Sequence, residues 1–248
     1  MHQIESDFAD FDTLFILPLQ PLNTQTQFSS STTKPPRPIR PGIFAFPPNR
    51  HTLGGTAYFI VEKVGNILVD SPAWNSTNQQ FLLEQGGVRW LFITHRNGIG
   101  QAITIQESLH CEIIIQEQEA YLLPETTVTT FEQEIAIAPQ FTGIWTPGYS
   151  PGSACLDYQS QGGCLFTGRH LLPNKQGKPA LLRMAKTFHW FRQLRSLEML
   201  CDRFTPHTLN YLFPGANSGF LRGKGYIDNP YQQLSELDIH KLRQSPVF

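Results

Sequence analysis

The sequence predicts an α/β protein in which two mixed β-sheets pack together with helices on the outside. Short runs rich in β-branched and aromatic residues recur along the chain, and several of them alternate with segments of helical periodicity. Their order is a hairpin, then βα units, then more hairpins, then a final βα unit, which is typical of two packed sheets. With 248 residues, of which 40% are hydrophobic, the chain can bury a full core.

The first half of the chain supports this class element by element. TAYFIVE and ILVD flank a Gly-Asn turn and predict a β-hairpin over residues 56–70. A helix is expected to begin with Asn75 or Ser76 as its N-cap and to end at Gly86. Downstream, the composition predicts a buried strand at VRWLFIT, a helix at IGQAITIQESLH, a strand at CEIII and a short helix at QEQEAYLL.

The second half continues with strands. EIAIA and TGIWT predict two strands, and ACLDY and GCLFTG predict a second hairpin. Apolar residues at helical spacing predict a long helix over residues 188–204. TLNYLFPG predicts a last strand, and a short helix is expected near Leu234–Leu242.

We expect three regions along the chain. Residues 1–50 form an amino-terminal arm and a proline-rich linker, residues 51–220 form the main domain, and residues 221–248 form a tail packed on it. Within the arm, LFILPLQPL is interrupted by Pro18 and Pro21 and is either a short edge strand or part of the arm.

Composition excludes several classes of protein. A net charge of −1 argues against general attraction to nucleic acid or membranes, and no apolar run approaches the roughly 20 residues that span a bilayer. The acidic amino terminus does not look like a secretory signal, so we expect a soluble, cytoplasmic protein. The four cysteines form no CxxC pair; Cys155 and Cys164 could face each other across a hairpin, but free buried thiols are favoured.

Five stretches of sequence carry a family resemblance: GGTAYFIV with NILVDSP, ITHRNGIGQA, TPGYSPGSACL, LFTGRHL and FPGAN. In this order they resemble the motifs of the metallo-β-lactamase fold superfamily. The resemblance implies a four-layer αββα sandwich with a metal site at one edge of the sheets, where Asp70 ends the second strand of the opening hairpin. It also implies descent from hydrolases.

The metal ligands that the resemblance implies are largely absent. The resemblance implies seven ligands: three histidines and one aspartate in the first motif, a histidine in the next, a bridging aspartate and a last histidine. In chain order, the corresponding positions here are His95, Asn97, Ile99, Gly100, Tyr149, Arg169 and Ala216. Only His95 is retained. Zinc needs about three or four ligands, and a guanidinium in place of a bridging carboxylate repels a dication. We therefore expect no metal cofactor at the usual place.

The leading hypothesis is a metal-free pseudo-enzyme that binds an anionic small molecule or an acidic protein surface. No Asp or Glu lies between Tyr158 and Leu197, whereas seven Arg and Lys residues do, and arginine suits carboxylate or phosphate. Few aromatic residues interleave with these basic residues, which argues against nucleic acid. The candidate ligand-binding residues are Asp70, His95, Arg96, Asn97, Tyr149, Arg169 and His170.

Several alternatives stay open. Arg169 could fill the vacated space and pair with Asp70, bind an anion, or do both. The competing class is a hydrolase, either with one Zn or Fe ion at a rebuilt site of His95, His170 and Asp70 or Asn97, or with metal-independent acid–base catalysis. The catalytic candidates are then His95, Tyr149 and His170, and His51 and Asn97 are possible lining residues.

Overall fold

The structure is a computed structural model that describes residues 34–247. Most of the expected amino-terminal arm, including LFILPLQPL, lies outside the described residues. In the described part, no helix is long and apolar enough to cross a membrane.

The first sheet has seven strands in chain order. Its first four strands pair antiparallel and its last four pair parallel, so β4 belongs to both halves. The strands are β1 (Arg37–Arg40), β2 (Ile43–Ala45), β3 (Tyr58–Ile60), β4 (Ile67–Val69), β5 (Trp90–Ile93), β6 (Glu112–Gln116) and β7 (Val128–Phe131).

The second sheet has six strands in the order β15-β14-β11-β10-β9-β8, and all its pairs are antiparallel except β11 with β14. A separate two-stranded hairpin joins β12 to β13. These strands are β8 (Glu134–Ala138), β9 (Phe141–Trp145), β10 (Ala154–Tyr158), β11 (Cys164–Gly168), β12 (Leu172–Pro173), β13 (Pro179–Ala180), β14 (Tyr211–Pro214) and β15 (Ile227–Asp228).

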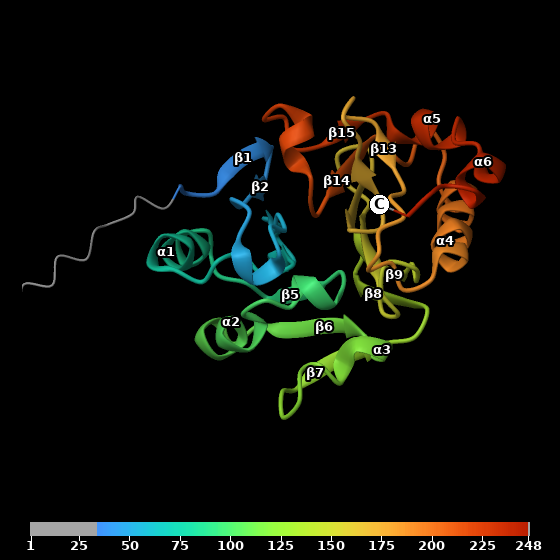
Figure 1. Cartoon of the computed structure of the whole chain (residues 1–248). Coiled ribbons are helices and arrows are strands. Elements are labelled where there is room, and N and C mark those ends of the chain that lie inside the picture. Colours follow the sequence, from blue (N-terminus) through green and yellow to red (C-terminus); the bar gives the residue numbers. More distant parts are fainter. Residues whose placement is uncertain (1–33, 248) are drawn as a thin grey trace, which may run out of the picture. The chain divides into compact units, whose positions relative to one another are not determined.

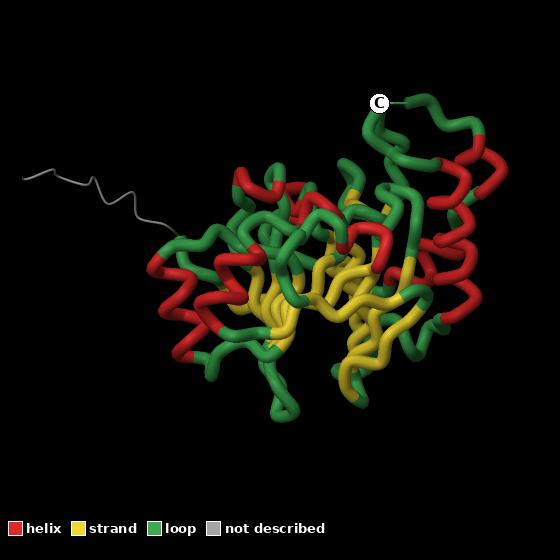
Figure 2. Tube along the Cα trace, turned by 90° about the horizontal axis from the view of Figure 1, so that it is seen from below, coloured by secondary structure: helices red, strands yellow, loops and turns green. Residues whose placement is uncertain are grey.

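Helices cover the outer faces of both sheets (Figures 1 and 2). Helices α1 and α2 lie beside the first sheet, and α4, α5 and α6 lie beside the second, which gives the predicted αββα order of layers. The helices are α1 (Ser76–Glu84), α2 (Ala102–Leu109), α3 (Glu117–Ala120), α4 (Trp190–Arg203), α5 (Pro230–Ser235) and α6 (Ile239–Arg243). Short 3-10 turns are η1 (Arg50–Thr52), η2 (Arg96–Gly98) and η3 (Ser218–Leu221).

Alternation along the buried strands builds the layers. In β4, Ile67 and Val69 join the core between the two sheets, whereas Leu68 faces the core under α1 and α2. In β5, Phe92 joins the core between the two sheets, and Leu91 faces the core under α1 and α2. Each such fully buried side chain contributes about 1.5–3 kcal/mol of hydrophobic stabilisation, so both faces of the first sheet hold the fold together.

The structure differs from the sequence analysis at residues 37–45. We expected a linker there, but β1 and β2 pair with each other and β2 pairs with β3. Ile43 is completely buried in the core between the sheets, and Pro38 is tolerated because β1 is an edge strand. The strand β7 and the short strands β12, β13 and β15 were also not expected. The proposed division at residues 50 and 220 stays a prediction.

Candidate functional site

The carboxyl ends of three parallel strands meet at one edge of the first sheet. Strands β4, β5 and β6 run in register, so the residues that follow them come together. Asp70 follows β4, Thr94 and His95 follow β5, and Glu119 follows β6 by three residues. In open α/β sheets this edge is where ligands bind.

Asp70 is buried and its hydrogen bonds are supplied by Thr94. The Thr94 backbone N–H donates to Oδ1 at 2.8 Å, and the Thr94 hydroxyl donates to Oδ2 at 2.6 Å. Burial raises the pKa of Asp70 to about 6, and the Thr94 hydrogen bonds oppose that rise. Gly98 lies so close to the carboxylate that a Cβ at this position would be 2.1 Å from Asp70 Oδ1.

His95 continues this chain of hydrogen bonds. Its Nδ1 lies 2.8 Å from the Thr94 hydroxyl oxygen, and that hydroxyl already donates its hydrogen bond to Asp70. The network therefore places the proton on Nδ1 and leaves Nε2 with a lone pair, which has no hydrogen-bond partner among the described residues. Burial, together with the charges of Arg169 and Arg96, lowers the pKa of His95 to about 3, so the imidazole is neutral at pH 7.

Tyr149 and Asn97 close the space where the resemblance places metal ligands. Both occupy positions of family histidines, and the Tyr149 hydroxyl donates a hydrogen bond to Asn97 Oδ1 at 2.7 Å. The edge of the Tyr149 ring packs against His95, with centroids 5.1 Å apart. Burial raises the pKa of Tyr149. A direct hydrogen bond thus connects two side chains that would otherwise face a metal.

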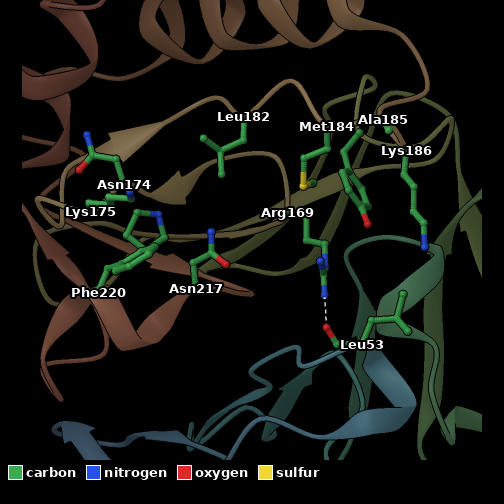
Figure 3. Close-up of a pocket in the computed structure, with 12 residues that line it drawn as sticks. Leu53, Arg169, Asn174, Lys175, Leu182, Met184, Ala185, Lys186, Asn217 and Phe220 are labelled. Atoms are coloured by element: carbon green, nitrogen blue, oxygen red, sulfur yellow. Dashed lines mark hydrogen bonds between the residues drawn. The ribbon is translucent and has the colours of Figure 1, made fainter. Parts of the chain in front are cut away.

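Arg169 does not pair with Asp70, which corrects one of the expectations. Its Nη2 donates to the backbone carbonyl of Leu53 at 2.7 Å (Figure 3) and to that of Thr52 at 3.2 Å. Asp70 is already satisfied by Thr94 and covered by Gly98, so its oxygens are not free to receive the guanidinium. The arginine instead fastens the loop at η1 to the end of β11.

Glu119 belongs to the same edge, and the sequence analysis missed it. Its side chain is completely buried, and its Oε1 accepts a hydrogen bond from Arg96 Nε at 3.0 Å. Its Oε2 has no partner among the described residues. The signal that could have found it is its position just after β6, at the edge shared with Asp70 and His95.

His170 and His51 do not form part of this cluster. His170 is buried with both ring nitrogens unpartnered in the described structure, and burial lowers its pKa to about 3. Its backbone carbonyl accepts a hydrogen bond from Gln193, which fixes it under α4. His51 is exposed on η1. Neither residue lines the pocket described below. The expectation of an Arg/His-lined binding pocket stays a prediction.

The residues present do not fit a dinuclear metal centre. Across residues 34–247, no group of three or more His, Cys, Asp or Glu side chains is arranged to hold a metal ion. Ile99 and Gly100 offer no donor side chain, Ala216 is a buried methyl group, and Arg169 brings positive charge. Among the described residues at the seven positions that the resemblance assigns to metal ligands, His95 Nε2 is the one free imidazole nitrogen.

A pocket of about 740 Å³ opens beside Arg169 and Tyr149. Among its lining residues are three cationic side chains and no carboxylate. Figure 3 shows Arg169 and Lys186 pointing in the same direction, towards the side where Leu53 lies, with Lys175 at the other end. Apolar surface separates the two ends, contributed among others by Leu182, Met184 and Phe220. We name this the apolar–basic pocket.

Comparison with known proteins places the fold. No protein-family model matches the sequence, and no curated protein sequence matches it. A metallo-β-lactamase family protein from Thermus thermophilus superposes with a TM-score of 0.59 and 18% identity over 83% of this chain and 81% of that chain. A metallo-β-lactamase from Staphylococcus aureus gives 0.59 and 16% over 82% and 67%.

A third similar structure holds metal. The protein TTHA1623, solved in a di-iron-bound form, gives a TM-score of 0.55 and 18% identity over 73% of this chain and 92% of that chain. Together with the order of layers, these likenesses confirm the resemblance: the chain has the metallo-β-lactamase fold. At this identity they show the fold and not the chemistry.

Proposed function

We propose that this protein is a metal-free pseudo-enzyme that binds an anionic small molecule in the apolar–basic pocket. The observation that carries the proposal is the pocket's lining, which combines Arg169, Lys175 and Lys186 with apolar surface and has no carboxylate. A concave, largely apolar site with a few convergent charged groups is typical of small-molecule binding. The cationic ends favour a carboxylate or phosphate on an apolar body.

Arg169 is suited to receive the anionic group because it is already held in place. Its Nη2 is anchored on the carbonyls of Leu53 and Thr52. A fixed guanidinium loses little side-chain entropy when a ligand arrives. Its charge acts at the edge of a largely apolar pocket, where attraction to an anion is stronger than in water.

Acid–base catalysis is less well supported than binding. His95 has a pKa of about 3 and is a weak base at neutral pH, and burial raises the pKa of Tyr149, which makes it a weak acid. A single Zn or Fe ion could use His95 Nε2, but it would need two or more further donors that the described residues do not group there. We therefore prefer the binding function over the rebuilt-site hydrolase.

The proposal is tested by titration calorimetry with undecanoic acid in buffer containing a chelator. We expect binding in the presence of the chelator, weakened about tenfold when one charge-assisted contact is removed in Arg169→Gln or Lys186→Gln. The matched control is Arg195→Gln, the same change on the exposed face of α4 outside this pocket. Lys186 is exposed, so its variant keeps the fold even if Arg169→Gln does not.

Two outcomes would contradict the proposal. One is binding that disappears when the chelator is added, which would make a metal the receptor of the anion. The other is binding that is equally strong in wild type, Lys186→Gln and folded Arg169→Gln protein, which would place the ligand elsewhere.

A further inference from the structure

A second, more polar pocket adjoins the apolar–basic pocket. It has a volume of about 410 Å³, and its lining includes Lys175, Lys178, Arg222 and Lys224. Asp228 is the one carboxylate among its lining residues, and it forms an ion pair with Lys224. Three cationic side chains therefore remain for a ligand. We name this the basic pocket.

The two pockets are neighbours that share two lining residues. Both are lined by Lys175 and Phe220, which lie in Figure 3 at the end of the apolar–basic pocket away from Arg169 and Lys186. Lys175 sits in the β12–β13 turn, which Asn174 stabilises by accepting hydrogen bonds from the N–H groups of Gln176 and Lys178. One elongated molecule could therefore extend from Arg169 past Phe220 into the basic pocket.

The loop that forms this junction has an unusual backbone. Asn217 and Arg222, the residues that flank η3, both have left-handed conformations, with φ of 57° and 48°. Residues other than glycine adopt this conformation at a cost in free energy. Residues with this backbone strain are found more often at functional sites. Within this loop, Phe220 lines both pockets and Arg222 lines the basic pocket.

We propose that the ligand is elongated and carries an anionic group at each end of an apolar body, with a phosphate-type group in the basic pocket. This inference rests on the proposed function, which places the first anionic group at Arg169 and Lys186. The basic pocket fits a phosphate-type group because its cations come from separate segments around a polar space. Such a group has up to two charges and three acceptor oxygens to share among them.

The test uses three probes that differ only at their ends. Undecanoic acid has the carboxylate alone, undecylphosphonic acid has the phosphonate alone, and ω-phosphonoundecanoic acid has both. We expect the two-ended probe to bind about tenfold or more tightly than undecanoic acid, because it gains a charge-assisted contact in the basic pocket. Probes with shorter and longer chains are compared, so that a mismatch in length does not hide the effect.

Variants assign each end to its pocket. Arg222→Gln and Lys178→Gln are expected to lower the affinity of the two-ended probe to that of undecanoic acid, and to leave undecanoic acid itself unchanged. Arg195→Gln is again the control, since Arg195 lines neither pocket. Lys178 lies exposed in a turn and contributes its backbone N–H to that turn, so Lys178→Gln is expected to fold.

The outcomes separate this inference from the proposed function. If undecanoic acid binds through Arg169 but no two-ended probe binds more tightly, the second end has no site and the inference is overturned while the proposed function stands. If undecanoic acid does not bind and undecylphosphonic acid binds through Arg222, the proposed function fails. The idea of one ligand that bridges both pockets fails with it.

Discussion

At the scale of single residues, the edge cluster at the carboxyl ends of β4, β5 and β6 contains buried polar groups that hydrogen-bond to one another. His95, Thr94 and Asp70 form one chain of hydrogen bonds, and Tyr149 and Asn97 form another contact beside it. An unsatisfied buried polar group costs free energy, so these hydrogen bonds stabilise the cluster. Within this described cluster, His95 Nε2 and one oxygen of Glu119 are left unpaired.

The contact between Gly98 and Asp70 gives a first prediction. Gly98→Ala is expected to destabilise the protein by about 1–3 kcal/mol, because the new methyl group overlaps the Asp70 carboxylate. Gly219→Ala is the matched control, since a Cβ at Gly219 has no heavy atom within 4 Å. Urea unfolding of both variants measures the effect, and equal midpoints would show that the Gly98 contact is not restrictive.

Stability towards acid gives the second prediction. For His95 and His170, the pKa falls from 6.5 in the unfolded chain to about 3 in the folded protein. The contribution of these two histidines to the free energy of unfolding is therefore complete above pH 6.5 and is lost as the pH falls towards 3. Asp70 acts in the opposite sense, because its folded pKa of about 6 exceeds the unfolded value of 3.8. The free energy of unfolding should thus fall as the pH decreases from 6.5, with Asp70 offsetting one of the two histidines below pH 6.

A variant isolates one of the two histidines. In His170→Leu the free energy of unfolding should fall less steeply between pH 6.5 and 4, by about 1.4 kcal/mol per pH unit, because one proton fewer is taken up on unfolding. Denaturant titrations at a series of pH values measure this slope. An unchanged slope would mean that His170 is protonated or solvated in the folded protein.

Sequence reasoning reached some of these residues and missed others. It placed Asp70, His95, Asn97, Tyr149 and Arg169 near one another through the order of motifs. It did not find the role of Thr94, because a hydroxyl that bridges Asp70 and His95 depends on rotamers and not on spacing. For the same reason it could give a pairing of Arg169 with Asp70 only as one alternative, whereas the guanidinium reaches the backbone of η1.

At the scale of elements, the η1 turn supports the arginine. Asn49 caps η1, with its Oδ1 accepting from the N–H groups of His51 and Thr52, and its amide donates to the Ser71 carbonyl at 3.0 Å. The carbonyls of Thr52 and Leu53 then receive Arg169. The capped turn η1, which lies between β2 and β3 of the first sheet, therefore positions the Arg169 side chain at the end of β11 in the second sheet.

This arrangement predicts that Asn49→Ala weakens anion binding without removing any group from the pocket. The matched control is Asn75→Ala, which removes the cap of α1, where Asn75 accepts from the Asn78 N–H at 3.0 Å. Each variant should lose about 1 kcal/mol of stability, but only Asn49→Ala should lower the affinity for undecanoic acid. Equal affinities for the two variants would show that η1 does not position Arg169.

Elements with strong periodicity or clear caps were predictable, and edge strands were not. The helix capped by Asn75 and the hairpin of β3 and β4 formed as expected. Strands β1 and β2 were hidden because the prolines around them are typical of linkers. Their pairing depends on β3, which is distant in sequence, so no local pattern indicated it.

At the scale of the whole molecule, three hydrophobic cores hold the fold together. One core lies between the sheets and another lies under each helical layer, and the edge cluster is outside all three. Because we propose that the protein is metal-free, we expect a chelator to leave the thermal unfolding midpoint unchanged. A midpoint that falls with chelator and recovers with added zinc would contradict this expectation.

The most direct test of the central claim is the metal content of the purified protein. The protein is prepared without chelator or a metal-leaching tag, dialysed against zinc, iron and manganese in turn, and measured by inductively coupled plasma mass spectrometry beside His95→Ala. We predict metal far below one equivalent in both proteins under every condition. One equivalent that is retained by the wild type and lost in His95→Ala would contradict the account, and would show that His95 Nε2 ligates a metal in a rebuilt site.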